Sequence, residues 1–170
     1  RSQCVIIGEA LGTVPEGLEH KLAEVGLLSY KVLYFERWPE GLFKRADIYP
    51  AEALVTVSTH DLPPLAGWWQ ASELDHMAAL GHFHSPEAEQ HEREQRAHDR
   101  LRLLDALVDA GTLAPDHGID PHHTDLDERV LAAAQGFLAK TPSRLLAVPV
   151  EDLLGLADQV NLPGTVDEHP

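Results

Sequence analysis

Residues 4–15 read CVIIGEALGTVP. The first five of them, Cys4–Gly8, are almost uniformly apolar, which is typical of a parallel strand that other elements cover on both faces. Pro15 suits an early position in a helix, apolar residues at one-face spacing follow it, and Gly26 marks the end of that helix. The stretch therefore predicts a strand, a loop that carries Glu9, and a helix, which is the repeating unit of a parallel α/β sheet.

The rest of the chain repeats this alternation. Strands are also predicted at Tyr30–Glu36, Leu54–Thr59 and Arg144–Val150, and further helices at 87–110 and at 126–139, the last with Thr124 as its N-cap. Right-handed crossovers connect such strands, and four of them without an obvious edge strand fit half of an eight-stranded barrel. The segment between the third and fourth strands is longer than a standard crossover, so we expect an inserted helical subdomain at about residues 72–125.

Composition narrows the classes of partner. The formal net charge of −15 over 170 residues disfavours nucleic acid and anionic membranes, which both select for basic patches, but it is compatible with neutral carbohydrate. The only cysteine, Cys4, excludes a disulfide within the chain and favours a reducing, cytoplasmic location. No apolar run approaches the roughly 20 residues that cross a bilayer.

Both ends of the chain indicate a piece of a longer polypeptide. The sequence opens at Arg1 without an initiator methionine and enters a strand within a few residues, and residues 161–170 read as a loop before a further element. We expect exposed strand edges at both ends of such a piece.

Two carboxylates follow predicted strands, Glu9 after the first and Asp61 after the third. Reactive groups of a parallel barrel gather at the carboxyl ends of its strands. A pair of carboxylates in one cleft can cleave a glycosidic bond, because one donates a proton to the leaving oxygen while the other stays ionised and stabilises the transition state. The open alternative is that each carboxylate caps a helix or pairs with an arginine.

Four motifs, in this order, resemble the 4-alpha-glucanotransferase family, also called amylomaltases or disproportionating enzymes. They are residues 5–15 (VIIGEALGTVP), 30–36 (YKVLYFE), 58–63 (STHDLP) and 161–165 (NLPGT). Together they extend over essentially the whole chain. The resemblance implies a (β/α)8 barrel of the alpha-amylase type, of which these are strands five to eight, with the helical insertion after strand seven.

The resemblance also implies roles for single residues. Glu9 corresponds to the general acid and base, and Asp61 to the carboxylate that grips sugar hydroxyls in the transition state. His60 would bind the same sugar, and Asn161 and Pro163 would line the cleft. The implied reaction is a retaining transfer of alpha-1,4-glucan segments, with maltooligosaccharides as donor and acceptor and without a cofactor.

The sequence departs from the family pattern at two places. Ala10 stands where the family has Asp, which is either a tolerated change or one that alters acceptor binding or rate. The family's nucleophilic Asp lies in an Asp-His-Phe-Arg-Gly-like motif on the preceding strand, and no such motif occurs here. We therefore expect this chain to be inactive without the missing N-terminal half; a noncatalytic glucan-binding remnant and an alpha-glucan hydrolase are the alternatives.

Aromatic, acidic and histidine residues outside these motifs leave further choices open. Trp68 follows Asp61 closely and either stacks on a sugar or packs in the core, and the same holds for Trp69. The pair Glu151–Asp152 either reaches the cleft or caps the turn that follows it. Histidines such as those at 82, 84, 91, 122 and 123 lie in polar stretches without cysteine, so we expect no metal site.

Overall fold

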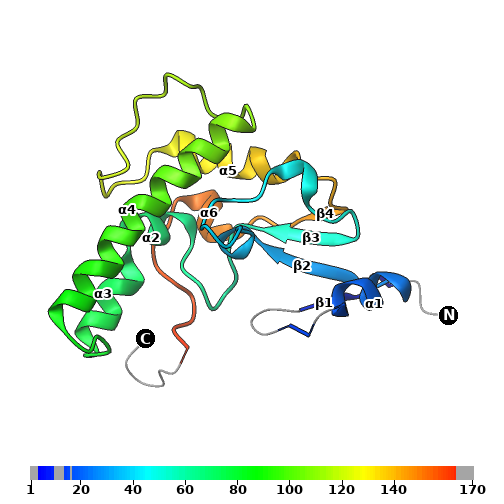
Figure 1. Cartoon of the computed structure of the whole chain (residues 1–170), viewed down its shortest axis with the longest axis horizontal. Coiled ribbons are helices and arrows are strands. Elements are labelled where there is room, and N and C mark those ends of the chain that lie inside the picture. Colours follow the sequence, from blue (N-terminus) through cyan, green and yellow to red (C-terminus); the bar gives the residue numbers. More distant parts are fainter. Residues whose placement is uncertain (1–3, 10–13, 16, 164–170) are drawn as a thin grey trace.

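The computed structural model describes residues 4–9, 14–15 and 17–163, and its centre is a parallel sheet (Figure 1). Within these residues the sheet has the strand order β1-β2-β3-β4, which is also the order along the chain. The strands are β1 (Ile7–Gly8), β2 (Leu28–Val32), β3 (Ala53–Thr56) and β4 (Leu145–Leu146), and every neighbouring pair is parallel. The predicted parallel α/β sheet is confirmed.

The strand boundaries differ from the prediction. β2 ends at Val32 because Leu33–Phe35 turns into a 3-10 helix, η1. β1 and β4 are short because only two residues of each are paired, and each has a neighbour on one side only in the described structure. The last residue of the predicted fourth strand, Val150, instead opens a short helix after Pro149.

Helices connect the strands. They are α1 (Leu18–Glu24), α2 (Leu65–Gln70), α3 (Ser72–Ala79), α4 (Pro86–Asp109), α5 (Glu128–Ala139) and α6 (Val150–Leu154), with a 3-10 helix, η2, at Ala46–Ile48. The helix predicted at 87–110 is confirmed as α4. The N-cap prediction of Thr124 is wrong: α5 begins after Asp127, whose carboxylate accepts a hydrogen bond from the N–H of Arg129 at 2.8 Å.

The long segment between β3 and β4 shares the core of the sheet. Leu104 and Leu107 of α4 are buried in the same cluster as Val55 of β3 and Phe137 of α5. The other half of α4 projects from the sheet beside α3 as an antiparallel pair (Figure 1). That residues 72–125 form a subdomain of their own stays a prediction. No helix in the described part of the chain is both long and apolar enough to span a membrane.

Candidate functional site

A cavity of about 320 Å³ opens at the carboxyl ends of the strands, and we call it the rim cavity. Tyr30 of β2, Thr56 of β3 and Ala147 after β4 line it together with His60 and Glu151. Tyr30 pairs with Leu54, two residues before Thr56, so the alternation of side chains puts Tyr30 and Thr56 on the same face of the sheet. One face of the sheet therefore leads directly into the cavity.

His60 and Asp61 lie in a tight turn directly after β3. The N–H of Asp61 donates to Thr59 Oγ1 at 3.2 Å, and the N–H of Leu62 donates to the carbonyl oxygen of Thr59 at 3.1 Å. His60 Nε2 lies 3.4 Å from Asp61 Oδ1, and the two side chains are 68% and 46% exposed. The turn thus presents an imidazole and a carboxylate side by side to solvent.

A second loop, 100 residues further along the sequence, holds this turn in place. The side-chain amide of Asn161 donates to Asp61 Oδ1, and the backbone N–H of Asn161 donates to the carbonyl oxygen of His60 at 3.2 Å. Gln159 Nε2 donates to the carbonyl oxygens of Asp61 at 2.9 Å and of Asn161 at 2.7 Å. The structure therefore brings together His60, Asp61 and Asn161. The sequence did not predict a role for Gln159, because it belongs to no motif and only lies two residues before Asn161.

Pro163 and Asp61 line a smaller cavity of about 280 Å³. Met77, Leu80 and His82, from the end of α3 and the turn after it, complete that cavity on the other side. Helix α3 and the turn after it thus approach the His60–Asp61 turn.

Glu9 follows β1 directly and is exposed. The register pairs Gly8 with Ser29, so the next position places Glu9 opposite Tyr30, with both side chains on one face. The pKa of Tyr30 agrees with this placement, because burial and then the charge of Glu9 raise it. Ala10 and the end of the NLPGT motif, Gly164 and Thr165, lie outside the described residues.

The carboxylate of Asp152 caps a helix and does not reach the cleft. Its Oδ1 accepts a hydrogen bond from the N–H of Leu65, the first residue of α2, at 2.7 Å, and its Oδ2 accepts from Gln135 Nε2 at 3.3 Å. Burial raises the pKa of this carboxyl. Asp152 therefore caps α2 and not the turn that follows it, whereas its neighbour Glu151 lines the rim cavity.

The prediction of Trp68 as a sugar-binding residue does not match its position. The side chain is 5% exposed, its ring stacks on Tyr34 at a centroid distance of 5.3 Å, and the guanidinium carbon of Arg96 lies 4.8 Å from the ring centroid. Trp69 is fully buried as well. Large aromatic rings contribute most when they are buried, and here both tryptophans stabilise the core behind the site.

Gly67 in α2 gives a first prediction about the loop that holds Asp61. A Cβ atom at Gly67 would lie 2.2 Å from the carbonyl oxygen of Ala157, two residues before Gln159. Gly67→Ala is therefore expected to displace this loop and to lower the free energy of unfolding by about 1–3 kcal/mol. Thermal unfolding of the complete protein measures the effect.

Gly136→Ala is the matched control. The nearest atom to a Cβ there is Thr112 Cγ2 at 3.5 Å, which is an ordinary contact in the middle of α5. Because alanine favours the helix over glycine by roughly 0.5–1 kcal/mol, this variant should keep or raise the unfolding temperature. Equal unfolding temperatures for Gly67→Ala and the unchanged protein would contradict the tight packing of α2 on this loop.

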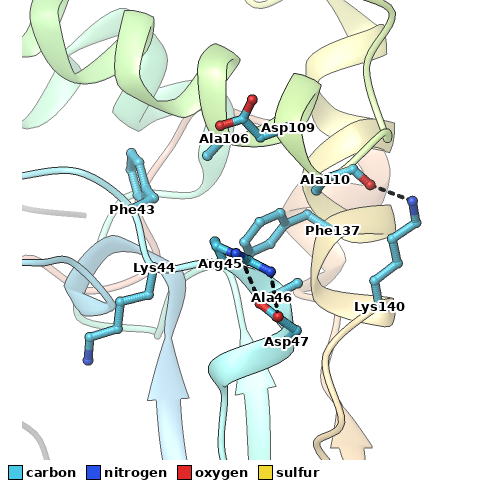
Figure 2. Close-up of a pocket in the computed structure, with 10 residues that line it drawn as sticks. All are labelled: Phe43, Lys44, Arg45, Ala46, Asp47, Ala106, Asp109, Ala110, Phe137 and Lys140. Atoms are coloured by element: carbon cyan, nitrogen blue, oxygen red, sulfur yellow. Dashed lines mark hydrogen bonds and ion pairs between the residues drawn. The ribbon is translucent and has the colours of Figure 1, made fainter.

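A separate cavity of about 470 Å³ lies between the segment 43–47, α4 and α5 (Figure 2). Arg45 and Lys140 in its lining have partners: Arg45 Nη2 lies 2.6 Å from Asp47 Oδ2, and Lys140 Nζ donates to the carbonyl oxygen of Ala110 at 2.5 Å. It shares no lining residue with the rim cavity. Among the described residues, no three His, Cys, Asp or Glu side chains are grouped to hold a metal ion.

Comparisons with known proteins point to one family. The 4-alpha-glucanotransferase family profile matches residues 1–170. A 4-alpha-glucanotransferase of Haemophilus influenzae is 36% identical over 170 residues, and one of Mycobacterium bovis is 38% identical over 175 residues. Each match includes the whole chain but only 24% and 23% of the relative, so the chain spans about a quarter of their length.

Solved structures agree. The crystal structure of amylomaltase from Corynebacterium glutamicum matches 98% of this chain with a TM-score of 0.84 and 30% identity, and the match covers 24% of that enzyme. Amylomaltase from Streptococcus agalactiae in complex with acarbose matches 96% of this chain with a TM-score of 0.56 and 20% identity, which is a likeness of fold.

Proposed function

The chain belongs to the 4-alpha-glucanotransferase family, and from this premise we propose that the complete protein transfers alpha-1,4-glucan segments between maltooligosaccharides by double displacement. One observation carries the proposal. Glu9 and the His60–Asp61 turn follow β1 and β3 at the same edge of one parallel sheet, on either side of Tyr30 in β2. Glycosidic bond exchange requires a carboxyl group that gives and takes a proton, and the reactive groups of a parallel barrel gather at this rim, where Glu9 and Asp61 supply the acid/base and a second carboxylate.

Glu9 acts in both steps of this mechanism. In the first step its proton moves to the scissile glycosidic oxygen while a carboxylate nucleophile bonds to the anomeric carbon and the leaving glucan departs. In the second step Glu9 takes the proton of an acceptor 4-hydroxyl, whose oxygen displaces the nucleophile and forms the new bond. An exposed position at a strand end, which leaves the carboxyl accessible to both glucans, supports this role.

The Asp61 carboxylate accepts hydrogen bonds from hydroxyls of the sugar ring that passes through the transition state. Its contacts support the role, because the side-chain amide of Asn161 donates to the carboxylate beside His60, while the N–H of Asp61 donates to Thr59 Oγ1 and fixes the turn. His60 contacts the same ring, and Asn161 and Pro163 border it. Trp68 has no part in this proposal because it is buried.

In this proposal the nucleophile comes from a part of the polypeptide outside these 170 residues. β1–β4 are then strands five to eight of the barrel, and the other half closes it and supplies the aspartate, so that the piece alone is inactive. Exposed apolar side chains at both outer strands support closure. Val5 beside β1 is 68% exposed, and Leu145 and Leu146 of β4 are each 39% exposed, whereas barrel strands are paired on both sides.

Two alternatives predict different products. A hydrolase would use water in place of the acceptor glucan, and a noncatalytic remnant would bind glucans without changing them. Transfer requires that an oriented acceptor outcompetes water at the intermediate. The reaction needs no cofactor and involves neither nucleic acid nor membrane, and the cytoplasmic location stays a prediction.

The test is a product analysis with the complete protein and maltotriose. We expect glucose and longer maltodextrins to appear together while the total concentration of reducing ends stays constant, because each transfer breaks one bond and forms one. A steady rise in reducing ends would identify a hydrolase. Binding of maltodextrin without any product would identify a remnant.

A further inference from the structure

Tyr30 lies between the two halves of the proposed site. The register of the parallel pair, extended by one residue, puts it opposite Glu9, which follows β1, and it lines the rim cavity with Thr59 and His60 on the other side. It is only half-buried, although Leu28 and Val32 on the same face of β2 are buried. A half-buried phenol in this place faces the space where Glu9 would meet a glucan.

The surroundings keep Tyr30 a hydrogen-bond donor. Burial and the negative charge of Glu9 both raise its pKa above the usual value near 10, so the hydroxyl stays protonated at neutral pH. A phenol O–H that reaches a carboxylate can donate to it, and a hydrogen bond to a charged group is stronger than one between neutral groups. Such a hydrogen bond is strongest after Glu9 has given up its proton, because Glu9 is then negatively charged.

We propose that Tyr30 is a positioning residue for Glu9: its hydroxyl donates to the Glu9 carboxylate and holds it toward the rim cavity between the two proton transfers. This inference rests on the acid/base role of Glu9 in the proposed function. Tyr30 touches the reaction only through Glu9, so its loss impairs those steps that need proton transfer and spares those that do not.

Tyr30→Phe in the complete protein is the first test. It removes one oxygen atom, and we expect kcat on maltotriose to fall by roughly 10- to 100-fold with little change in KM, because one hydrogen bond to a charged group is lost. A change in KM alone would instead place the hydroxyl on the substrate and would overturn the proposal.

A reaction without proton transfer separates positioning from general damage to the cavity. With α-maltosyl fluoride as donor and azide as acceptor, the nucleophile displaces fluoride ion and azide then displaces the nucleophile to give α-maltosyl azide. Neither step needs Glu9 to give or take a proton. Tyr30→Phe is expected to retain nearly full activity in this reaction, and an equal loss in both reactions would overturn the proposal.

A double-mutant comparison distinguishes the failure of this inference from the failure of the proposed function. In the Glu9→Gln background, Tyr30→Phe should lower maltotriose turnover by less than twofold, since its partner is already changed. If the losses of turnover from the two substitutions were additive, the proposed role of Tyr30 would be wrong and that of Glu9 would stand. If Glu9→Gln itself left turnover unchanged, the proposed function of Glu9 would fail first.

Tyr49→Phe is the matched control. Tyr49 is buried against Phe137, and its hydroxyl is a buried oxygen without a hydrogen-bond partner among the described residues. It lines neither of the two cavities beside the His60–Asp61 turn. This variant removes the same atom and is expected to keep the turnover of the unchanged protein in both reactions.

Discussion

Glu9→Gln in the complete protein is expected to lower turnover on maltotriose by about 10²–10⁴-fold, the usual contribution of a general acid and base. Glutamine keeps the size of the side chain but can neither give a proton to the leaving oxygen nor take one from the acceptor. Because Glu9 is exposed at the end of β1, the change should leave folding and maltodextrin binding nearly unaltered. Initial rates and calorimetric binding of maltodextrin measure the two effects separately.

Glu24→Gln controls for the loss of one negative charge. Glu24 is the last residue of α1, is exposed, and lies 3.2 Å from His20 on the same helix. Exposed ion pairs of this kind contribute little to stability, and Glu24 lines neither cavity beside the His60–Asp61 turn, so we expect turnover to stay within twofold of the unchanged protein. Near-normal turnover for Glu9→Gln would remove Glu9 from the acid/base role.

Asp61→Asn is expected to have the next largest effect, a fall in kcat of about 10²–10³-fold. This is the loss found when one fixed electrostatic contact to a transition state is removed. Asparagine fits the same turn, where the N–H of residue 61 bonds to Thr59, but it lacks the negative charge opposite the developing cation. The measurement is kcat on maltotriose, with unfolding temperature as a check of structure.

Asp47→Asn is the matched control for Asp61→Asn. Asp47 is exposed and pairs with Arg45 beside the separate cavity (Figure 2), which shares no residue with the rim cavity. We expect its turnover to equal that of the unchanged protein. A fall of less than tenfold for Asp61→Asn would mean that the carboxylate serves the loop contact with Asn161 more than the sugar.

The sequence predicted the parallel sheet because each strand carries its own local signal. Apolar and β-branched runs, separated by helical spacing, were sufficient to place four parallel strands and the long helix α4. Strand ends were harder, since pairing with a neighbour decides them: residues 33–35 continue an apolar run but form a 3-10 helix beyond the last paired residue of β2.

The burial of side chains was the second feature that the sequence did not predict reliably. The closeness of Trp68 to Asp61 along the chain suggested a sugar contact, but α2 turns the ring between Tyr34 and Arg96 in the core. In the same way, Asp152 caps a helix that begins 87 residues earlier. A local pattern cannot reveal a partner that the fold brings from so far away.

The sequence by itself determined the class of fold, the family, and the position of Glu9 and of the His60–Asp61 turn at strand ends, because each depends on residues that are neighbours along the chain. Only the tertiary structure decided that Asn161 and Gln159 hold that turn, and that Tyr30 stands beside Glu9. The physical reason is that hydrogen bonds and strand register depend on distance in space, and chain closure across 100 residues leaves no trace in local spacing.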